Sequence, residues 1–142
     1  LMNNPNDYSF DELTIGLRES FQLKITEFMV NDFARNSGDF NPLHVDSMYS
    51  KSTKFGKKIC HGMLLASFFS KLIGMHLPGK NALYFSQTLN FLEPCFIGDD
   101  ITIEGELLDK SMATQIITIK TSIFNNSRKC LVDGIAKVIL IK

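Results

Sequence analysis

The chain has 142 residues, the usual size of one domain and enough to bury a core without disulfide or metal staples. Hydrophobic residues make up 44% of it and charged residues 21%, as in an ordinary globular protein. Fifteen basic side chains balance fifteen acidic ones, which argues against nucleic acid or a membrane surface as a partner. A neutral chain also sets up no net repulsion between copies, so self-association stays open.

The cysteines and the apolar stretches bear on the cellular compartment. The chain has three cysteines without paired spacing: Cys60, Cys95 and Cys130. This pattern suggests buried, reduced thiols and fits neither a disulfide framework nor a zinc site. Residues 1–7 are polar and lack the apolar stretch of a signal peptide. Residues 63–77 are interrupted by polar side chains and are too short to span a bilayer. We therefore expect a cytoplasmic protein with a tail over residues 1–9 and one domain over residues 10–142.

The first half of the chain predicts one strand and three helical or loop segments. Residues 21–25 alternate between apolar and polar side chains, as a short strand does. Thr26 can cap a helix that runs to Asn36 and ends at Gly38. Residues 37–46 then form a loop stiffened by Pro42, followed by a short helix over residues 47–54.

A second helix is expected from His61 to about Met75. It is apolar nearly all round, apart from one stripe at helical spacing: Ser67, Ser70, Lys71 and Gly74. A helix with so little polar surface must be covered by other elements, and Leu77-Pro78-Gly79 ends it.

The second half predicts strands over residues 82–92, 101–107, 113–124 and 131–141, separated by turn residues. One apolar helix followed by antiparallel strands indicates an α+β domain, with a single sheet curled round the helix. Such a sheet has open edges, and pairing of edges across a dimer axis would protect them.

The loop Ser37-Gly38-Asp39-Phe40-Asn41-Pro42-Leu43-His44 carries the chemistry. Asp39 and His44 lie five residues apart on a stiffened loop, so a carboxylate and an imidazole can converge to hold a water and move its protons. Turn-forming polar residues are the plainer interpretation of the same pattern. A metal site at Asp39, His44 and Asp46 lacks a fourth ligand and a recognised spacing, so we expect no metal.

Cys60-His61-Gly62-Met63 begins the apolar helix. The first amides of a helix have no internal partner, and Gly62 lets an acyl oxygen approach, so its amide is a candidate oxyanion donor. A simple helix start is the alternative. His61 fits a packed histidine better than a catalytic one, and Cys60 fits a core thiol.

Together these motifs resemble the (R)-specific enoyl-CoA hydratases, the hydratase 2 or MaoC-like family of the hotdog fold. The resemblance rests on the loop from Ser37 to His44 and on His61-Gly62-Met63-Leu64-Leu65-Ala66-Ser67, with weaker matches at Leu77-Pro78-Gly79, Pro94 and Gly98-Asp99. It covers about residues 10–142. Lys58 stands near a position where the family often has proline. The nearby lysines either meet coenzyme A phosphates or form a solvated face: Lys51, Lys54, Lys57 and Lys58.

The resemblance implies a hotdog domain that works as a homodimer or dimer of dimers. It implies reversible hydration of trans-2-enoyl-CoA to (R)-3-hydroxyacyl-CoA, in acyl-CoA and fatty acid metabolism, with no cofactor. Asp39, His44 and Gly62 then match the catalytic positions. Three further residues are predicted to contact substrate: Asn41, His61 and Ser70.

Three other functions compete with this interpretation. A dehydratase acting on 3-hydroxyacyl chains held by an acyl carrier protein would use the same chemistry. A thioesterase would not call for a loop with both Asp39 and His44. A non-catalytic acyl-thioester-binding subunit shares the fold, but it has no reason to combine this loop with Gly62 at a helix start.

Overall fold

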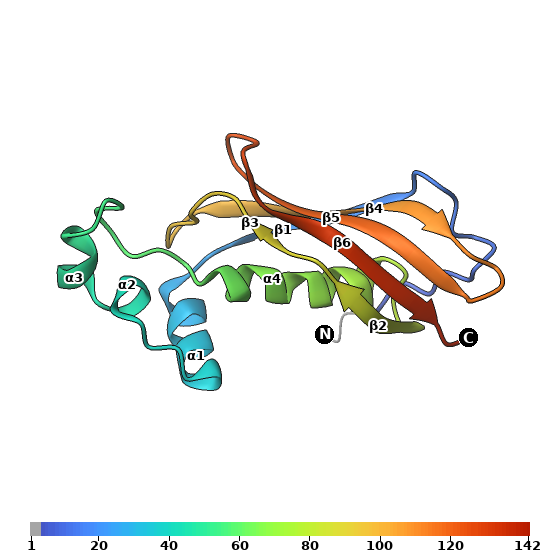
Figure 1. Ribbon diagram of the computed structural model, residues 1–142, viewed down its shortest axis with the longest axis horizontal. Coiled ribbons are helices and arrows are strands. Elements are labelled where there is room, and N and C mark those ends of the chain that lie inside the picture. The colour runs from blue at the N-terminus through green and yellow to red at the C-terminus, as the bar shows by residue number, and fades with distance from the viewer. Residues whose placement is uncertain (1–3) are drawn as a thin grey trace.

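The structure is a computed structural model and describes residues 4–142. Within that part, a six-stranded antiparallel sheet curls over one helix (Figure 1). The strands follow the order β1-β4-β5-β6-β2, and the two-residue β3 also pairs with β6. Their bounds are β1 (Arg18–Lys24), β2 (Ala82–Gln87), β3 (Asn90–Phe91), β4 (Asp100–Lys110), β5 (Ile116–Asn125) and β6 (Cys130–Leu140). The expected α+β hotdog is confirmed.

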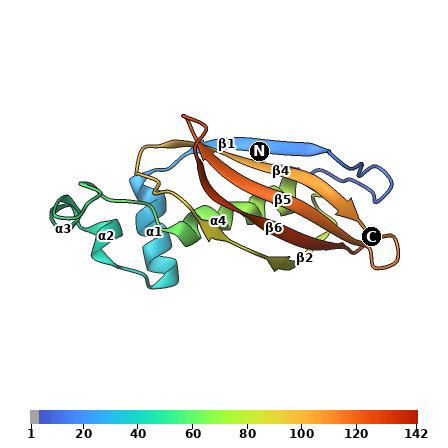
Figure 2. The same ribbon diagram turned by 45° about the horizontal axis from the view of Figure 1, so that its top comes forward.

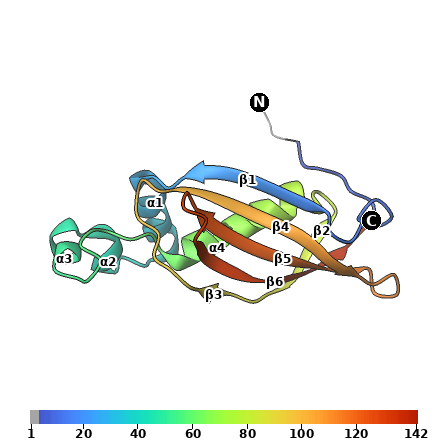
Figure 3. The same cartoon turned by 90° about the horizontal axis from the view of Figure 1, so that it is seen from above.

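The helices divide into one central helix and a group at one end of the sheet. They are α1 (Glu27–Ser37), α2 (Pro42–Val45), α3 (Ser47–Lys51), α4 (Gly62–Lys71) and the π-helical segment η1 (Leu72–His76). Figures 2 and 3 show α4 under the sheet, with α1, α2 and α3 clustered beyond its N-terminal end. The start of α4 therefore faces the loop that connects α1 to α2.

The core lies between α4 and the inner face of the sheet. Ile101, Ile103 and Leu107 of β4 are at most 1% exposed, as their alternation with polar residues predicted. Leu65, Phe69 and Leu72 pack against the sheet from the helix side and are at most 2% exposed. Removing each such side chain from water contributes roughly 1.5–3 kcal/mol, so this layer fixes α4 beneath the strands.

Several expected elements differ in detail. The predicted loop over residues 37–46 contains α2, a single helical turn that Asn41 caps by accepting from the Leu43 amide at 3.0 Å. The last turn of the central helix, expected to be α-helical, is the π-helical η1. The strand predicted over residues 82–92 is interrupted between β2 and β3, where Thr88 Oγ1 accepts from the Ile135 amide. One-turn elements and interruptions leave no periodic pattern in a sequence.

The two edges of the sheet differ in character. The edge strand β1 has the sequence Arg-Glu-Ser-Phe-Gln-Leu-Lys, with charges at both ends. The opposite edge strand β2 has the sequence Ala-Leu-Tyr-Phe-Ser-Gln and no charged residue. Leu83 and Phe85 on β2 are 53% and 61% exposed. Charged edges resist pairing with another strand, whereas an apolar edge invites it.

The segment before β1 packs on the end of the domain. The Asn6 amide donates to the Met75 carbonyl oxygen (2.8 Å), and the Tyr8 hydroxyl donates to Glu19 (3.0 Å). A Cβ at Gly79, where φ is +97°, would lie 1.9 Å from the Asn6 carbonyl oxygen, so this contact requires glycine. The predicted boundary between residues 9 and 10 stays a prediction, and residues 1–3 of that tail lie outside the described residues. No helix within residues 4–142 has the length and apolar character needed to cross a bilayer.

Candidate active site

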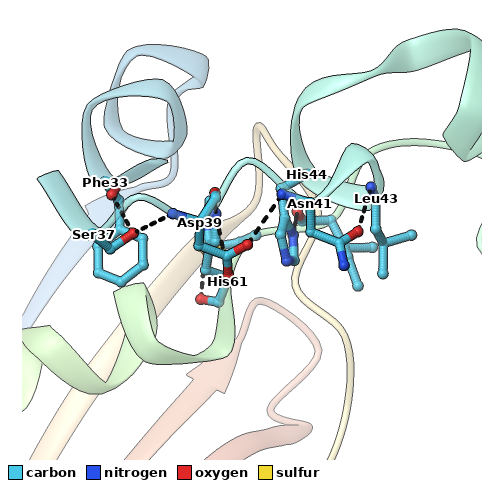
Figure 4. A network of polar contacts seen from close by, with 9 residues as sticks. Phe33, Ser37, Asp39, Asn41, Leu43, His44 and His61 are labelled. Atoms are coloured by element: carbon cyan, nitrogen blue, oxygen red, sulfur yellow. Dashed lines mark hydrogen bonds and ion pairs between the residues drawn. The ribbon is translucent and has the colours of Figure 1, made fainter. Parts of the chain in front are cut away.

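The predicted loop begins where α1 ends. Thr26 caps α1 and Gly38 terminates it with φ of +81°, as predicted. The Ser37 hydroxyl donates to the Phe33 carbonyl oxygen (2.7 Å) and accepts from the Asp39 amide (3.1 Å). These bonds turn the chain sharply off the helix, so Asp39 points toward the start of α4 (Figure 4).

Asp39 and Asn41 shape the next turn through their own side chains. Asp39 Oδ1 accepts from the Asn41 amide at 3.1 Å, which leaves Oδ2 to face His61 at 4.0 Å. The Asp39 side chain is 50% exposed, so its carboxylate is both held and reachable. Asn41 Oδ1 caps α2. The substrate contact predicted for Asn41 stays a prediction.

His44 projects from α2, and its ring is oriented by a backbone carbonyl. His44 Nδ1 lies 2.8 Å from the Ile59 carbonyl oxygen. Because a carbonyl oxygen only accepts, this bond assigns the proton of the neutral ring to Nδ1. His44 Nε2 then carries a lone pair that can take a hydrogen bond or a proton.

His61 is the N-cap residue of α4 and is buried, with a side chain only 2% exposed. Its Nε2 donates to the Asp39 carbonyl oxygen at 3.0 Å. Its ring stacks on His44, with ring centroids 3.9 Å apart, and contacts the Phe33 ring at 4.8 Å. Burial lowers the pKa of His61, and the neighbouring His44 lowers it further, against the raising effects of the Asp39 carbonyl and carboxylate.

Gly62 follows directly as the first residue of α4, where helix amides point outward without an intrahelical acceptor. A pocket of about 410 Å³ reaches this glycine. Its lining combines apolar side chains with a few polar ones, among them Lys54, Leu65, Phe91, Leu92, Glu93 and Val132. A Cβ at Gly62 would lie 2.7 Å from Phe91 Cδ1, so a side chain here would require the Phe91 ring or the start of α4 to shift.

Ser70 lies on the exposed side of α4, eight residues beyond Gly62. At 1.5 Å per residue this places it about 12 Å along the helix axis, away from Asp39 and His44 within one chain. Its substrate contact stays a prediction.

The lysines near the site have separate surroundings. Lys54 lines the pocket with Gly62, whereas Lys51, Lys57 and Lys58 line a neighbouring cleft of about 290 Å³. Lys58 forms an ion pair with Glu27.

Asp39, His44 and His61 place three potential metal-ligand atoms within 4.8 Å of one another. The lone pairs of an imidazole lie in the plane of its ring. The His44 and His61 rings stack with only 30° between their planes, so their lone pairs do not converge on one ion. This donor set fits acid–base chemistry better than a tetrahedral metal site.

Cys60 is a core thiol, as predicted. Contact with the Cys95 thiol, and then burial, raise the pKa of Cys60, which disfavours a nucleophilic thiolate. Cys60, Cys95 and Cys130 are all free.

Sequence reasoning missed three partners of the site: the Ile59 carbonyl, the Phe33 ring and the Phe91 ring. A backbone carbonyl has no residue-type signature, and both phenylalanines looked like ordinary core residues. Only their distance from the motif residues in space identifies them.

A curled antiparallel sheet over one central helix defines the class of this protein as a hotdog domain, and a carboxylate and two imidazoles lie together at the N-terminal end of that helix. The family described as MaoC like domain matches residues 14–126. The chain belongs to the MaoC-like family.

Relatives agree with this assignment. An (R)-specific enoyl-CoA hydratase from Aeromonas caviae is 40% identical over 92% of this chain and 97% of its own length. Another from Rhodospirillum rubrum is 34% identical over 92% of this chain and 90% of its own length. A solved (R)-hydratase from A. caviae superposes with a TM-score of 0.88 at 41% identity, covering 90% of this chain and 97% of that one.

Proposed function

We propose that this protein adds water reversibly to trans-2-enoyl-CoA and forms (R)-3-hydroxyacyl-CoA. The observation that carries the proposal is the convergence of Asp39 and His44 beside the start of α4, where Gly62 faces a pocket. Similarity to the (R)-specific enoyl-CoA hydratases named above supports the proposed substrate and the proposed configuration of the product.

The proposed reaction begins with a water held between Asp39 and the Nε2 lone pair of His44. The water oxygen bonds to C3 of the enoyl group while Asp39 takes one of its protons. The electrons of the double bond move toward the thioester oxygen, and the Gly62 amide stabilises that developing negative charge. Return of the proton to C2 restores the Asp39 carboxylate, so one water is added and no cofactor is consumed.

Stereospecificity follows from the fixed contacts of this arrangement. With the thioester oxygen held at Gly62, only one face of the double bond meets the water on the Asp39 loop. A single water that supplies both the hydroxyl and the C2 proton gives syn addition.

The test is hydration of crotonyl-CoA in D₂O. The rate is measured by the loss of enoyl-thioester absorbance, and the product is then analysed for its configuration at C3 and its deuterium at C2. We expect (R)-3-hydroxybutyryl-CoA with deuterium at one C2 position. Predominantly (S) product, or deuterium in both C2 positions at early times, would contradict the proposal. The same assay with the enoyl chain on an acyl carrier protein distinguishes a coenzyme A substrate from a carrier-bound one. We expect the carrier-bound enoyl chain to react more slowly than the coenzyme A thioester.

We also propose that the active form is a homodimer, or a dimer of dimers, built on the β2 side. β2 is an uncharged edge strand with exposed Leu83 and Phe85. Met63, Phe91 and Leu92 add exposed apolar surface around the start of α4. Exposed apolar side chains along an uncharged sheet edge are the kind of surface that a second copy covers.

Light scattering should give about twice the 16.0 kDa of one chain, or four times for a dimer of dimers. Phe85→Lys should weaken the association. Met112→Lys, in the turn between β4 and β5, is the matched control because Met112 is also exposed. A fully active 16 kDa monomer would disprove the dimer.

A further inference from the structure

We propose that His61 is a positioning residue that ties the loop carrying Asp39 and His44 to the helix start carrying Gly62. This inference rests on the proposed hydratase function and replaces the substrate contact predicted for His61. A side chain that is 2% exposed offers almost no surface to a substrate.

One ring makes three separate contacts with the acid–base loop and its support. His61 Nε2 donates to the Asp39 carbonyl oxygen at 3.0 Å, which fixes the backbone from which the carboxylate projects. The ring stacks on His44 at 3.9 Å with 30° between the planes, which limits rotation of that imidazole. The Phe33 ring packs against it at 4.8 Å with a 55° tilt. Figure 4 shows the three rings and Asp39 gathered at this point.

The protonation state of His61 suits this role. Its Nε2–H is used by the Asp39 carbonyl oxygen, and its Nδ1 is buried without a hydrogen-bond partner within residues 4–142. A second proton on Nδ1 would be a buried donor without an acceptor, which is costly. The titratable groups that face the ring are Asp39 and His44. Because His61 stays neutral, we assign the proton transfers of the proposed water to Asp39 and His44 and not to His61.

The backbone of His61 links this loop to the oxyanion donor. Gly62 is the next residue, and the His61 carbonyl oxygen accepts from the Leu65 amide at 3.3 Å in the first turn of α4. Movement of the His61 ring would therefore change the separation between the water held by Asp39 and the thioester oxygen held by Gly62. Such displacements of about 1 Å can cost roughly 10²-fold in rate.

Two substitutions distinguish the role of the His61 Nε2–H donor from that of its aromatic ring. His61→Phe keeps an aromatic ring but removes Nε2–H, whereas His61→Gln keeps an N–H donor near the same place. We expect His61→Phe to lower kcat about 10²-fold with KM changed less than about threefold. His61→Gln should recover most of that loss and keep the wild-type pH dependence of kcat, because the proposed proton transfers use Asp39 and not the His61 ring. His76→Gln is the matched control, because His76 also stacks on an aromatic ring, Phe21, at 5.0 Å, but lies in η1.

Nuclear magnetic resonance of the histidine rings tests the inference without using activity. The wild-type His61 ring should be the Nε2–H tautomer at neutral pH. His61→Phe should shift the His44 ring signals, and His76→Gln should not. Three results would overturn the positioning role: wild-type kcat in folded His61→Phe, a change confined to KM, or a pH dependence of kcat in His61→Gln that differs from that of the wild type. A wild-type protein that shows these ring signals but hydrates no enoyl-CoA would instead contradict the proposed function.

Discussion

His44 and His61 stack face to face with ring centroids 3.9 Å apart, and each donates one N–H to a backbone carbonyl. The donors differ: His44 uses Nδ1 toward Ile59, and His61 uses Nε2 toward Asp39. The two rings therefore hold opposite tautomers. The free nitrogen of His44 is available for water, while that of His61 is buried.

Asp39→Asn should abolish most of the hydratase activity and leave the fold intact. The amide keeps an oxygen that can accept from Asn41 but cannot take a proton from water. We expect kcat to fall about 10²–10⁴-fold, the usual loss when a general base is removed. Asp32→Asn is the control, because Asp32 pairs with Arg35 on the surface of α1. Wild-type kcat in folded Asp39→Asn would exclude Asp39 as the base.

Gly62→Ala should impair the reaction through Phe91. The new methyl would lie 2.7 Å from Phe91 Cδ1, so either the ring or the start of α4 must move. We expect kcat/KM to fall roughly 10²-fold from displacement of the amide. Phe91→Ala in the same chain should restore part of the loss, since it removes the clashing ring. Equal activities of Gly62→Ala and the double variant would show that Phe91 does not mediate the effect.

Gly134→Ala should destabilise the sheet severely. Its Cβ would lie 1.8 Å from the Thr88 carbonyl oxygen, and backbone atoms cannot move aside as a side chain can. We expect the free energy of unfolding to fall by about 3 kcal/mol or more. Gly74→Ala is the control, because a Cβ there meets nothing within 4 Å. Urea unfolding that gave both variants the same stability would contradict the crowding at Thr88.

Acid should destabilise the protein through His61. Burial lowers its folded-state pKa below the ordinary 6.5, so the unfolded chain binds more protons below that pH. The free energy of unfolding that the neutral His61 ring contributes is fully present above about pH 6.5. It is lost as the pH falls toward the folded-state pKa, by at most about 1.4 kcal/mol per pH unit. Urea unfolding at several pH values should show this loss in His76→Gln and not in His61→Gln. Identical pH dependence in both variants would rule out the linkage.

Much of the scaffold was predictable because its signals are local. Thr26 and Gly38 mark the two ends of α1 because they cap the helix. In β4, the alternation of Ile101, Ile103 and Leu107 with polar residues predicted which face is buried. The loop with Asp39 and His44 was identified by its resemblance to a known family, since spacing alone would also fit a simple turn.

The tertiary structure decided how the site residues are held. The Ile59 carbonyl orients His44, the Asp39 carbonyl accepts from His61, and the Phe91 ring lies where a Cβ at Gly62 would point. Each of these contacts joins residues far apart in the chain. Two of them use backbone atoms, which every residue carries, so no residue type marks them in a sequence. Folding alone brings them within bonding distance.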